Sequence, residues 1–325
     1  MKYRKFGSTG IDISEIVFGA GAVGGVVFQT DRDTRIEAVR RGLDYGINWI
    51  DTAASYGDGQ SEENLGWILK ELDADPYLST KVRIGPEHLG DITSEIQRSM
   101  EASLQRLQRE HVNLFQLHTA VTKERGTMRG SISLDDVLGD NGVIAGFERL
   151  REQGLCDFFG FTGFGDTNCI HQMIESGHFD SVQTYHNLLN PSAGRPVPDG
   201  FLAHDYGNMI GLAQERGVGI LDIRVLAAGA VAGVQNTGPA AGLSPGSGGE
   251  ADFLRAQKVN AALGDQEGTP AQTAIRFALM NLGVSGALVG FGQLDHIDDA
   301  VDMGPLSDDV MKQLDALYAS DFNTA

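Results

Sequence analysis

Short apolar runs alternate with longer amphipathic segments along almost the whole chain. The runs IVFGAG, INWID, YLSTKV and HVNLFQLH are each followed by a polar loop and then by apolar residues at helical spacing. About eight such strand–helix units can be counted, and nearly continuous apolar strands are typical of parallel strands covered on both faces. The pattern therefore predicts an α/β protein whose sheet is either a closed barrel or an open, doubly wound sheet.

Helix starts are indicated by capping residues at the edges of the amphipathic segments. Thr30 or Asp31 precedes the first helix, Ser61 opens the second and Thr93 opens the third. Before the first unit, residues 1–15 form two alternating runs around a glycine-containing turn, which predicts a β-hairpin. The expected helices span residues 32–45, 61–72, 93–107, 143–153, 167–176, 203–216, 251–263, 270–281 and 294–302.

Three predicted loops are longer than usual connections between a strand and a helix. They span residues 119–133, 187–202 and 227–250, and each follows a predicted strand. In a barrel all three lie at the C-terminal mouth, where such folds carry their chemistry. The third is rich in Ala, Gly, Ser and Pro, and we expect it to act as a lid over a ligand. No shift in composition divides the chain, so residues 1–325 are expected to form one domain.

The first apolar run ends in a glycine motif that resembles a dinucleotide-binding fingerprint. Gly19 to Gly24 reads GAGAVG, which matches G-x-G-x-x-G. That fingerprint requires a helix to begin at the third glycine, whereas the next helix is expected only near Asp31 or Arg32. Two interpretations remain: the glycines permit a tight turn at a barrel mouth, or they let a flat ring approach the barrel.

Four polar residues stand at or just after the ends of three successive predicted strands. Asp51, Lys81 and His118 end the runs NWID, DPYLSTK and VNLFQLH, and Tyr56 follows Asp51 in the next loop. Because the C-terminal ends of barrel strands meet at one mouth, we expect these side chains to lie together. Taken singly, each has an ordinary structural explanation, such as a turn cap, a packing residue or a hydrogen-bonded core histidine.

The joint pattern points to acid–base chemistry at a carbonyl or an alcohol. A tyrosine is a weak acid at neutral pH, and a neighbouring ammonium stabilises a phenolate. An aspartate beside Lys81 would keep the ammonium charged and oriented, while His118 would orient a substrate oxygen or relay a proton. Such a set suits hydride transfer, in which a cofactor supplies the reducing power. The residues also leave open a Schiff-base lyase with Lys81 as the nucleophile.

Composition excludes several other classes of protein. The formal net charge of -19 argues against partners such as nucleic acid or anionic membranes, and no stretch reaches the length of an apolar membrane span. The two cysteines, Cys156 and Cys169, are too few for a disulfide framework, and no His or Cys spacing indicates a metal site. The N-terminal residues lack the apolar centre of a signal peptide, so a cytoplasmic location is expected. The sequence carries no signal for an oligomeric state.

The same residues give the chain its resemblance to a known family. GINWIDTAASYGDGQSEENLGWIL, STK and LFQLH resemble the aspartate–tyrosine, lysine and histidine motifs of the aldo-keto reductases, and the resemblance covers essentially the whole chain. It implies a (β/α)8 TIM barrel with an N-terminal β-hairpin, an NAD(P)H cofactor across the mouth and reversible carbonyl reduction. It also implies Tyr56 as the general acid–base, Asp51 and Lys81 as the pair that tunes it, and His118 as the residue that orients the substrate.

The resemblance carries over a set of cofactor positions. Thr162 and Gly163 stand where the family usually has Ser-Asn, and Gln183 stands at its second contact with the cofactor's carboxamide. Ile223 replaces the usual ring-stacking aromatic, and Arg224 takes a position usually held by a small polar residue. The expected cofactor-binding residues are Gly19, Ala20, Gly21, Asp51, Thr162, Gly163, Gln183, Ile223, Arg224, Leu226, Gly290, Gly292, His296 and Asp299.

The choice of cofactor is expected from the last strand and the segment after it. Members that prefer NADPH carry Lys or Arg there for the 2′-phosphate, whereas Gly290 and His296 take those positions here, with Asp298 and Asp299 close by. Because carboxylates repel a phosphate, we expect NAD(H), or dual use of NAD(H) and NADP(H). Arg224 is the residue most able to favour NADP(H).

The substrate is expected to be a small carbonyl compound or a sugar. Phe28, Trp49, His88 and His186 are the predicted pocket residues. The start FGAGAVGG and the run GFTGF resemble members that oxidise aldoses, and the polar loops favour hydroxylated carbonyls over apolar aldehydes. A non-catalytic alternative is a nicotinamide-binding regulatory subunit, like the β subunits of potassium channels, which resemble this fold.

Overall fold

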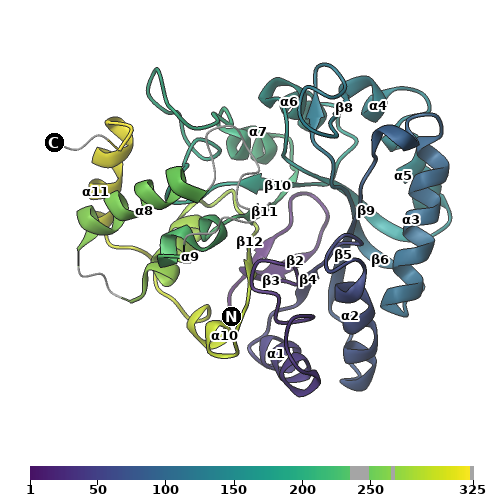
Figure 1. The fold of residues 1–325 in the computed structure, drawn as a ribbon, viewed down its shortest axis with the longest axis horizontal. Coiled ribbons are helices and arrows are strands. Elements are labelled where there is room, and N and C mark those ends of the chain that lie inside the picture. The colour runs from purple at the N-terminus through teal and green to yellow at the C-terminus, as the bar shows by residue number, and fades with distance from the viewer. Residues whose placement is uncertain (235–248, 265–267, 323–325) are drawn as a thin grey trace.

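The computed structural model describes residues 1–234, 249–264 and 268–322, and within them eight parallel strands close into a barrel (Figure 1). The strands hydrogen-bond in the order β10-β11-β12-β3-β4-β5-β6-β9. The predicted (β/α)8 barrel is confirmed, and the open, doubly wound sheet is excluded. The barrel strands are β3 (Ile16–Gly19), β4 (Trp49–Asp51), β5 (Tyr77–Val82), β6 (Val112–Leu117), β9 (Cys156–Thr162), β10 (Ser181–Tyr185), β11 (Gly219–Ile223) and β12 (Gly286–Gly290).

Helices cover the outside of the barrel, with α3 and α5 on one side and α8, α9 and α11 on the opposite side (Figure 1). α1 begins after Asp31, whose side chain accepts a hydrogen bond from the backbone N–H of Thr34, so one of the two expected caps is present. The α-helices are α1 (Arg32–Asp44), α2 (Gln60–Glu71), α3 (Ile92–Leu107), α4 (Leu134–Leu138), α5 (Val143–Glu152), α6 (Thr167–Glu175), α7 (Met209–Glu215), α8 (Gly249–Leu263), α9 (Pro270–Met280), α10 (Asp295–Asp299) and α11 (Asp308–Ala319). Two 3-10 helices are η1 (Pro86–His88) and η2 (Ala227–Ala232).

Two of these helices are shorter than predicted. The helix expected over 203–216 begins only at Met209, because Asn208 has a left-handed backbone with φ of 54° that an α-helix does not contain. The helix expected over 294–302 ends at Asp299. The short helix α4 and the last helix, α11, are absent from the predicted set. The other predicted helices differ from the structure by at most two residues at each end.

The N-terminal hairpin closes one end of the barrel. β1 (Tyr3–Lys5) pairs with β2 (Asp12–Ser14) in antiparallel register, as predicted. Phe6 directly follows β1 and packs against Trp49, with the two ring centroids 4.9 Å apart. We call the buried cluster around this contact the barrel floor; it consists of Phe6, Ile13, Val17, Trp49, Leu114 and Leu221.

The glycine motif after β3 serves a close approach between two backbones. Gly24 has φ of +100°, and a Cβ atom on it would lie 2.6 Å from the carbonyl oxygen of Phe291. A Cβ on Gly290 would lie 2.0 Å from the carbonyl oxygen of Val23. Side chains at either position would therefore push the loop away from the end of β12. The next helix begins only at α1, so the motif does not form a dinucleotide-binding turn.

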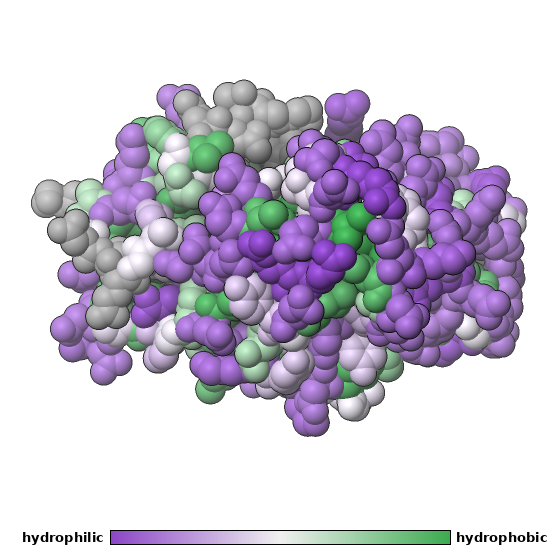
Figure 2. All heavy atoms as spheres, turned by 90° about the horizontal axis from the view of Figure 1, so that it is seen from below, coloured by the Kyte–Doolittle hydropathy of each residue, from purple (hydrophilic) through white to green (hydrophobic). Residues whose placement is uncertain are grey.

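The long loops follow barrel strands, as predicted, and one of them contains a small sheet. In the loop over 119–133, β7 (Val121–Thr122) pairs with β8 (Ile132–Ser133) in parallel. Of the loop over 227–250, which the sequence suggests as a lid, residues 235–248 lie outside the described residues. No described helix is long and apolar enough to cross a membrane. The face shown in Figure 2 is mainly hydrophilic, with hydrophobic residues in small patches.

Candidate active site

Asp51, Tyr56, Lys81 and His118 lie together at the C-terminal mouth of the barrel. Asp51 ends β4, Lys81 lies near the end of β5 and His118 directly follows β6, so three neighbouring strands position them. The Nζ atom of Lys81 is 3.2 Å from the Oη atom of Tyr56 and forms an ion pair with Asp51. The rings of Tyr56 and His118 meet edge to face, with their centroids 5.8 Å apart. The structure thus brings together the four residues that the sequence singles out.

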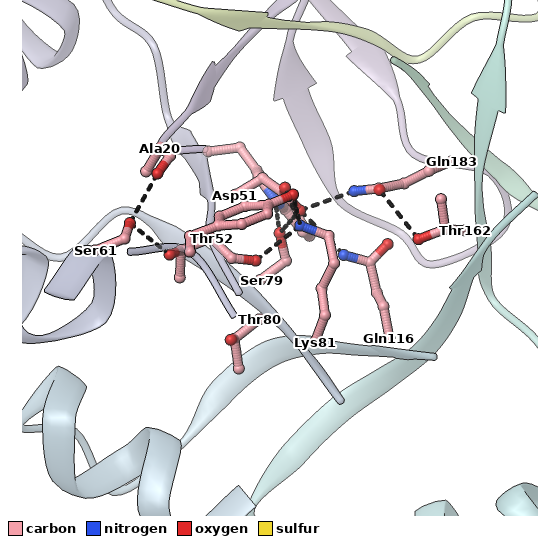
Figure 3. A network of polar contacts seen from close by, with 12 residues as sticks. Ala20, Asp51, Thr52, Ser61, Ser79, Thr80, Lys81, Gln116, Thr162 and Gln183 are labelled. Carbon is pink, nitrogen blue, oxygen red and sulfur yellow. Dashed lines mark hydrogen bonds and ion pairs between the residues drawn. The ribbon is translucent and has the colours of Figure 1, made fainter. Parts of the chain in front are cut away.

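Asp51 is held by a network of buried polar side chains (Figure 3). Its Oδ1 faces Lys81, and its Oδ2 accepts three further hydrogen bonds. The three donors are Ser79 Oγ at 2.7 Å, Gln116 Nε2 at 3.0 Å and Gln183 Nε2 at 2.9 Å. A buried carboxylate is costly unless its lone pairs are satisfied, and four donors satisfy this one. Because these donors come from three different strands, they also fix the direction in which the carboxylate points.

Lys81 remains an ammonium although its side chain is buried. Burial by itself lowers the pKa of a lysine, but the negative charge of Asp51 and the contact with Tyr56 outweigh it, so the pKa of Lys81 lies above its usual value. The Nζ atom also donates a hydrogen bond to the carbonyl oxygen of Thr52 at 2.8 Å. The ammonium is therefore directed at three oxygens, and one of them is the Tyr56 hydroxyl.

His118 is a neutral imidazole at the edge of the same site. Burial of the ring, together with the positive charges of Lys81 and Arg83, lowers the pKa of His118 well below its usual value. Its backbone N–H donates to the carbonyl of Val82 at 2.7 Å, and its ring stacks near Phe164 with centroids 6.4 Å apart. The Nδ1 atom is buried and has no hydrogen-bond partner among the described residues. A neutral imidazole offers one donor and one acceptor, which suits an uncharged substrate oxygen.

A pocket opens at the mouth beside these side chains. Besides the polar residues already described, it is lined mainly by glycines and apolar side chains. The lining residues are Gly19, Gly21, Ala22, Val23, Asp51, Tyr56, Arg83, His118, Thr162, Phe164, Gln183, Ile223, Arg224, Val225, Leu226, Ala228, Leu288, Val289 and Gly290. Within the described ranges, no cluster of His, Cys, Asp and Glu side chains could hold a metal ion. The pocket therefore joins an apolar wall to a small set of hydrogen-bonding groups, as small-molecule sites generally do.

Comparison with known proteins identifies the family. The sequence model described as the Aldo/keto reductase family matches residues 15–319. The chain belongs to the aldo/keto reductase family. It is accordingly an NAD(P)-dependent oxidoreductase, as the resemblance in its sequence implies.

Individual relatives are distant in sequence and similar over nearly their whole length. The L-galactose dehydrogenase of Arabidopsis thaliana is 26% identical over 310 residues, which cover 93% of this chain and 87% of that protein. A putative voltage-gated potassium channel subunit beta of Schizosaccharomyces pombe is 24% identical, with 97% and 92% of the two chains covered. A solved aldo/keto reductase from Klebsiella pneumoniae, in complex with NADP and acetate, has a TM-score of 0.70 at 23% identity, covering 98% and 96% of the chains, and shows the same fold.

Most of the cofactor positions expected for an aldo/keto reductase line the pocket. They come from the ends of β3, β4, β9, β10, β11 and β12, which together surround the mouth. The positions found in the lining are Gly19, Gly21, Asp51, Thr162, Gln183, Ile223, Arg224, Leu226 and Gly290.

Five expected cofactor positions do not line the pocket. The carbonyl of Ala20 accepts a hydrogen bond from the Oγ atom of Ser61 on α2 at 2.8 Å. Gly163 faces α7, since a Cβ on it would lie 3.1 Å from the Sδ atom of Met209. The remaining three, Gly292, His296 and Asp299, lie beyond the end of β12. His296 and Asp299 are on α10, and their side chains are exposed.

The groups present in the pocket fit a nicotinamide. Thr162 Oγ1 donates to Gln183 Oε1 at 3.5 Å, so a hydroxyl and an amide stand side by side where a carboxamide needs donors and acceptors. Ile223, Leu226 and Leu288 supply apolar surface for a flat ring. These residues would hold the nicotinamide ring and its carboxamide next to Tyr56, where the ring would supply or accept a hydride.

The expectation for the substrate pocket needs correction at several positions. Trp49 lies in the barrel floor, because the first residue of β4 is at the end of the strand opposite to the mouth. His186 points outward from the barrel, where it pairs with Asp222 and stacks on Phe277. Neither side chain lines the pocket in the described structure.

The other two expected substrate residues also lie outside the pocket lining. Phe28 packs against the turn after Tyr56, and a Cβ on Gly57 would lie 2.8 Å from its ring. His88 belongs to η1, and its Nδ1 accepts a hydrogen bond from the backbone N–H of Gly85 at 3.1 Å. Both residues support loops at the mouth, and the described pocket does not reach them.

Sequence reasoning missed several groups that the structure places at the site. Ser79 and Arg83 lie two residues before and after Lys81, and Gln116 lies two residues before His118. Side chains two apart on a strand point to the same side, so this spacing is a signal that the sequence contained. This spacing identifies further inward-facing side chains only after one inward-facing residue on each strand, such as Lys81, has been chosen as the reference.

Proposed function

We propose that this aldo/keto reductase interconverts an aldehyde or ketone and its alcohol, or an aldose and its lactone, by hydride transfer. The observation that carries the proposal is the chain of contacts from Asp51 through Lys81 to Tyr56 at the pocket. When bound, the nicotinamide cofactor supplies or accepts the hydride. In reduction the substrate oxygen takes a proton from the Tyr56 hydroxyl, and in oxidation the Tyr56 phenolate takes that proton back.

Each of the four residues has a distinct task in this scheme. Tyr56 is the general acid–base, and the Lys81 ammonium at 3.2 Å stabilises its phenolate once the proton has left. Asp51 keeps Lys81 charged and directed at the phenol. His118, as a neutral imidazole, donates a hydrogen bond to the substrate oxygen and so holds it near Tyr56.

The same contacts disfavour a Schiff-base lyase. An amine attacks a carbonyl only when it has lost its proton, and the ion pair with Asp51 raises the pKa of Lys81 above its usual value although burial opposes this. The amine also has no vacant position, since its three partners surround it. Treatment with a carbonyl substrate and borohydride should therefore add no covalent mass to Lys81, whereas a lyase would be trapped.

For the cofactor we infer a preference for NAD(H) or dual use of NAD(H) and NADP(H). Asp298 and Asp299 lie on α10 beyond β12, and carboxylates there oppose a 2′-phosphate. Asp298 is itself paired with Arg41 and Tyr45, each at 2.9 Å, which weakens its effect and favours dual use over strict exclusion of NADP(H). A preference for NADPH above about tenfold in kcat/KM, or about 1.4 kcal/mol, would contradict this inference.

The substrate class we favour is a hydroxylated carbonyl compound or an aldose. The full-length similarity to an L-galactose dehydrogenase supports it, together with the polar groups at the pocket edge. An apolar aldehyde would leave the guanidinium of Arg83 without a partner from the substrate at the mouth.

The test is a titration with NADH and NADPH by quenching of intrinsic fluorescence, followed by nicotinamide absorbance with a panel of aldehydes and aldoses. Binding and turnover, with turnover lost in Tyr56→Phe, are the expected result. Binding and full turnover in Tyr56→Phe would refute the acid–base assignment. The cofactor that binds more tightly tests the inference on NAD(H).

A second candidate is a non-catalytic regulatory subunit that binds the nicotinamide as a signal. The similarity to a putative potassium channel subunit beta over 97% of this chain favours it. The complete set of Asp51, Tyr56, Lys81 and His118 in contact favours catalysis instead. Tight cofactor binding with no turnover on any member of the panel would support the regulatory subunit.

A further inference from the structure

Arg83 extends the inner face of β5 into the mouth of the barrel. Ser79 and Lys81 point inward from this strand and both contact Asp51, whereas Thr80 between them points outward and bonds to Glu62 on α2. The same alternation places Arg83 on the inner side, and it lines the pocket beyond Lys81. In an extended chain it stands about 7 Å further along the strand direction than the lysine.

Arg83 forms no hydrogen bond or ion pair with any residue that the structure describes. Acidic residues outnumber basic ones in the chain by 44 to 25, so carboxylates are plentiful. Other arginines form ion pairs with carboxylates: Arg106 pairs with Glu62, and Arg125 pairs with Asp136. Arg83 differs from these paired arginines and lies in the lining of the pocket. It is free to bind an anion that enters the pocket.

The position of Arg83 around the barrel assigns it to the substrate rather than to the cofactor. Tyr56 follows β4 and His118 follows β6, and these are the two neighbours of β5. Arg224, the other arginine of the lining, follows β11, which is four strands away from β5 in either direction around the eight-stranded barrel. The two arginines therefore stand on opposite sides of the mouth. Arg83 stands with the proton-transfer groups, and Arg224 stands with the expected cofactor positions.

The charge of the lining agrees with an anionic ligand. Asp51 is the one carboxylate in the lining of the described pocket, and Lys81 neutralises it. Arg83 and Arg224 add positive charge in a chain whose formal net charge is -19. Because most of the surface repels anions, a local positive site gives selective attraction that an overall basic protein would not provide.

We propose that Arg83 determines specificity by binding the carboxylate of an acidic carbonyl substrate whose reacting oxygen lies at Tyr56 and His118. The planar guanidinium fork matches a carboxylate, with two parallel N–H···O hydrogen bonds. The substrate class is thereby an aldehyde or aldose that carries a carboxylate, such as a sugar acid. This inference rests on the proposed carbonyl oxidoreduction and adds the anionic group to it.

The experiment measures kcat/KM for two pairs of substrates that differ in a carboxylate. One pair is 4-carboxybenzaldehyde and 4-(hydroxymethyl)benzaldehyde, and the other is galacturonate and galactose. We expect the acidic member to be preferred by about tenfold or more, and Arg83→Met to reduce that ratio by a similar factor, chiefly through KM. Arg83→Lys should keep part of the preference, because it retains the charge and loses the bidentate fork.

The matched control is Arg129→Met. Arg129 is an exposed arginine in the loop after β6 and does not line the pocket. The acid-to-neutral ratio should stay the same in this variant. An equal loss of the ratio in Arg83→Met and Arg129→Met would overturn the proposal, since it would indicate general attraction of anions by surface charge.

A binding measurement separates this proposal from the proposed function. Calorimetric titration of the protein with 4-(hydroxymethyl)benzoate in the presence of NADH, which cannot accept a hydride from this alcohol, reports carboxylate binding without turnover. Binding in the wild type that weakens about tenfold in Arg83→Met supports the anion site even if no substrate is turned over. Turnover of both substrate pairs with no preference for the acid, unchanged by Arg83→Met, overturns the anion site and leaves the oxidoreductase assignment intact.

Discussion

Two buried acid–base pairs stand on opposite faces of the barrel wall. Asp51 and Lys81 point into the barrel and reach Tyr56 in the pocket. Asp222 on β11 and His186 after β10 point outward, with Nδ1 of His186 3.2 Å from Oδ2 of Asp222. The outward direction of Asp222 follows from the pleat, because the residue before it lies in the barrel floor and the residue after it lines the pocket.

The surroundings give the two pairs different properties. Four donors satisfy the Asp51 carboxylate, so it is held as the partner of a charged lysine. Asp222 receives hydrogen bonds only from His186 among the described residues, and burial raises its pKa to about 6 in spite of them. The inner pair therefore maintains a charge next to the pocket, and the outer pair ties the chain after β10 to β11. The strand face, rather than residue type, separates the two roles.

The largest effect that follows from this comparison concerns Tyr56, the residue to which the inner pair points. Tyr56→Phe removes the proposed proton donor, and turnover should fall by about 10²- to 10⁴-fold, while cofactor binding by fluorescence stays within about twofold. Phe277→Leu, which alters the ring stacked on the outer pair, is the matched control and should leave turnover largely intact. A similar loss of turnover in both variants would break the distinction between inner and outer pairs.

Removal of the inner cation should affect both activity and stability. Lys81→Met leaves the Asp51 carboxylate buried without its opposite charge, which should lower the free energy of unfolding by about 3–5 kcal/mol in urea titrations. Turnover should fall by about 10²- to 10³-fold, the range seen when a positioned donor is removed from an active site. Unchanged stability would mean that the hydrogen bonds from Ser79, Gln116 and Gln183 hold the carboxylate without the lysine.

The outer pair should make stability depend on pH in the mildly acidic range. The pKa of Asp222 is raised from 3.8 to about 6 by burial, so the folded state binds this proton more tightly than the unfolded state. Its contribution is present in full below pH 4 and is lost as pH rises through about 6, by roughly 3 kcal/mol in all.

The amide variant isolates this contribution. In Asp222→Asn the group no longer titrates, so the wild type should lose stability relative to the variant as pH rises from about 4 to about 7. Urea unfolding at a series of pH values measures this difference, in which the other titrating groups cancel. Turnover of the variant should remain near that of the wild type. A constant difference across the series would show that Asp222 is not the titrating group.

The smallest expected effect comes from a matched pair of buried serines. Ser79 Oγ donates to Asp51, whereas Ser181 Oγ is buried with no hydrogen-bond partner in the described structure. Ser79→Ala should cost about 1–2 kcal/mol of stability and a few-fold in kcat, because the carboxylate loses one donor and the buried indole N–H of Trp49 loses its acceptor. Ser181→Ala should be neutral or slightly stabilising, since it removes an unsatisfied polar group. Thermal unfolding and initial rates on both variants make the comparison.

Much of the site could be predicted because the active sites of such barrels lie at the C-terminal ends of the strands. Asp51, Lys81 and His118 end successive apolar runs, and strand–helix alternation places all such ends at one mouth. The start of α1 was likewise readable from its cap at Asp31. The caps expected at Ser61 and Thr93 were wrong, because α2 begins after Gly59 and α3 begins after Asp91. The boundaries failed where a single backbone conformation decided them, as at Asn208, whose positive φ delays the start of α7.

The sequence by itself determined the order of the barrel strands, most of the helices between them and the four residues at or near the strand ends, because hydrophobic period and capping are local properties of the chain. Only the tertiary structure decided which way the remaining polar side chains point. Trp49 and His186 proved to lie in the floor and outside the wall, while Gln116 and Gln183, far apart in sequence, both reach Asp51. The physical reason is that strand register and barrel closure, which no local pattern specifies, set the inner face of each strand.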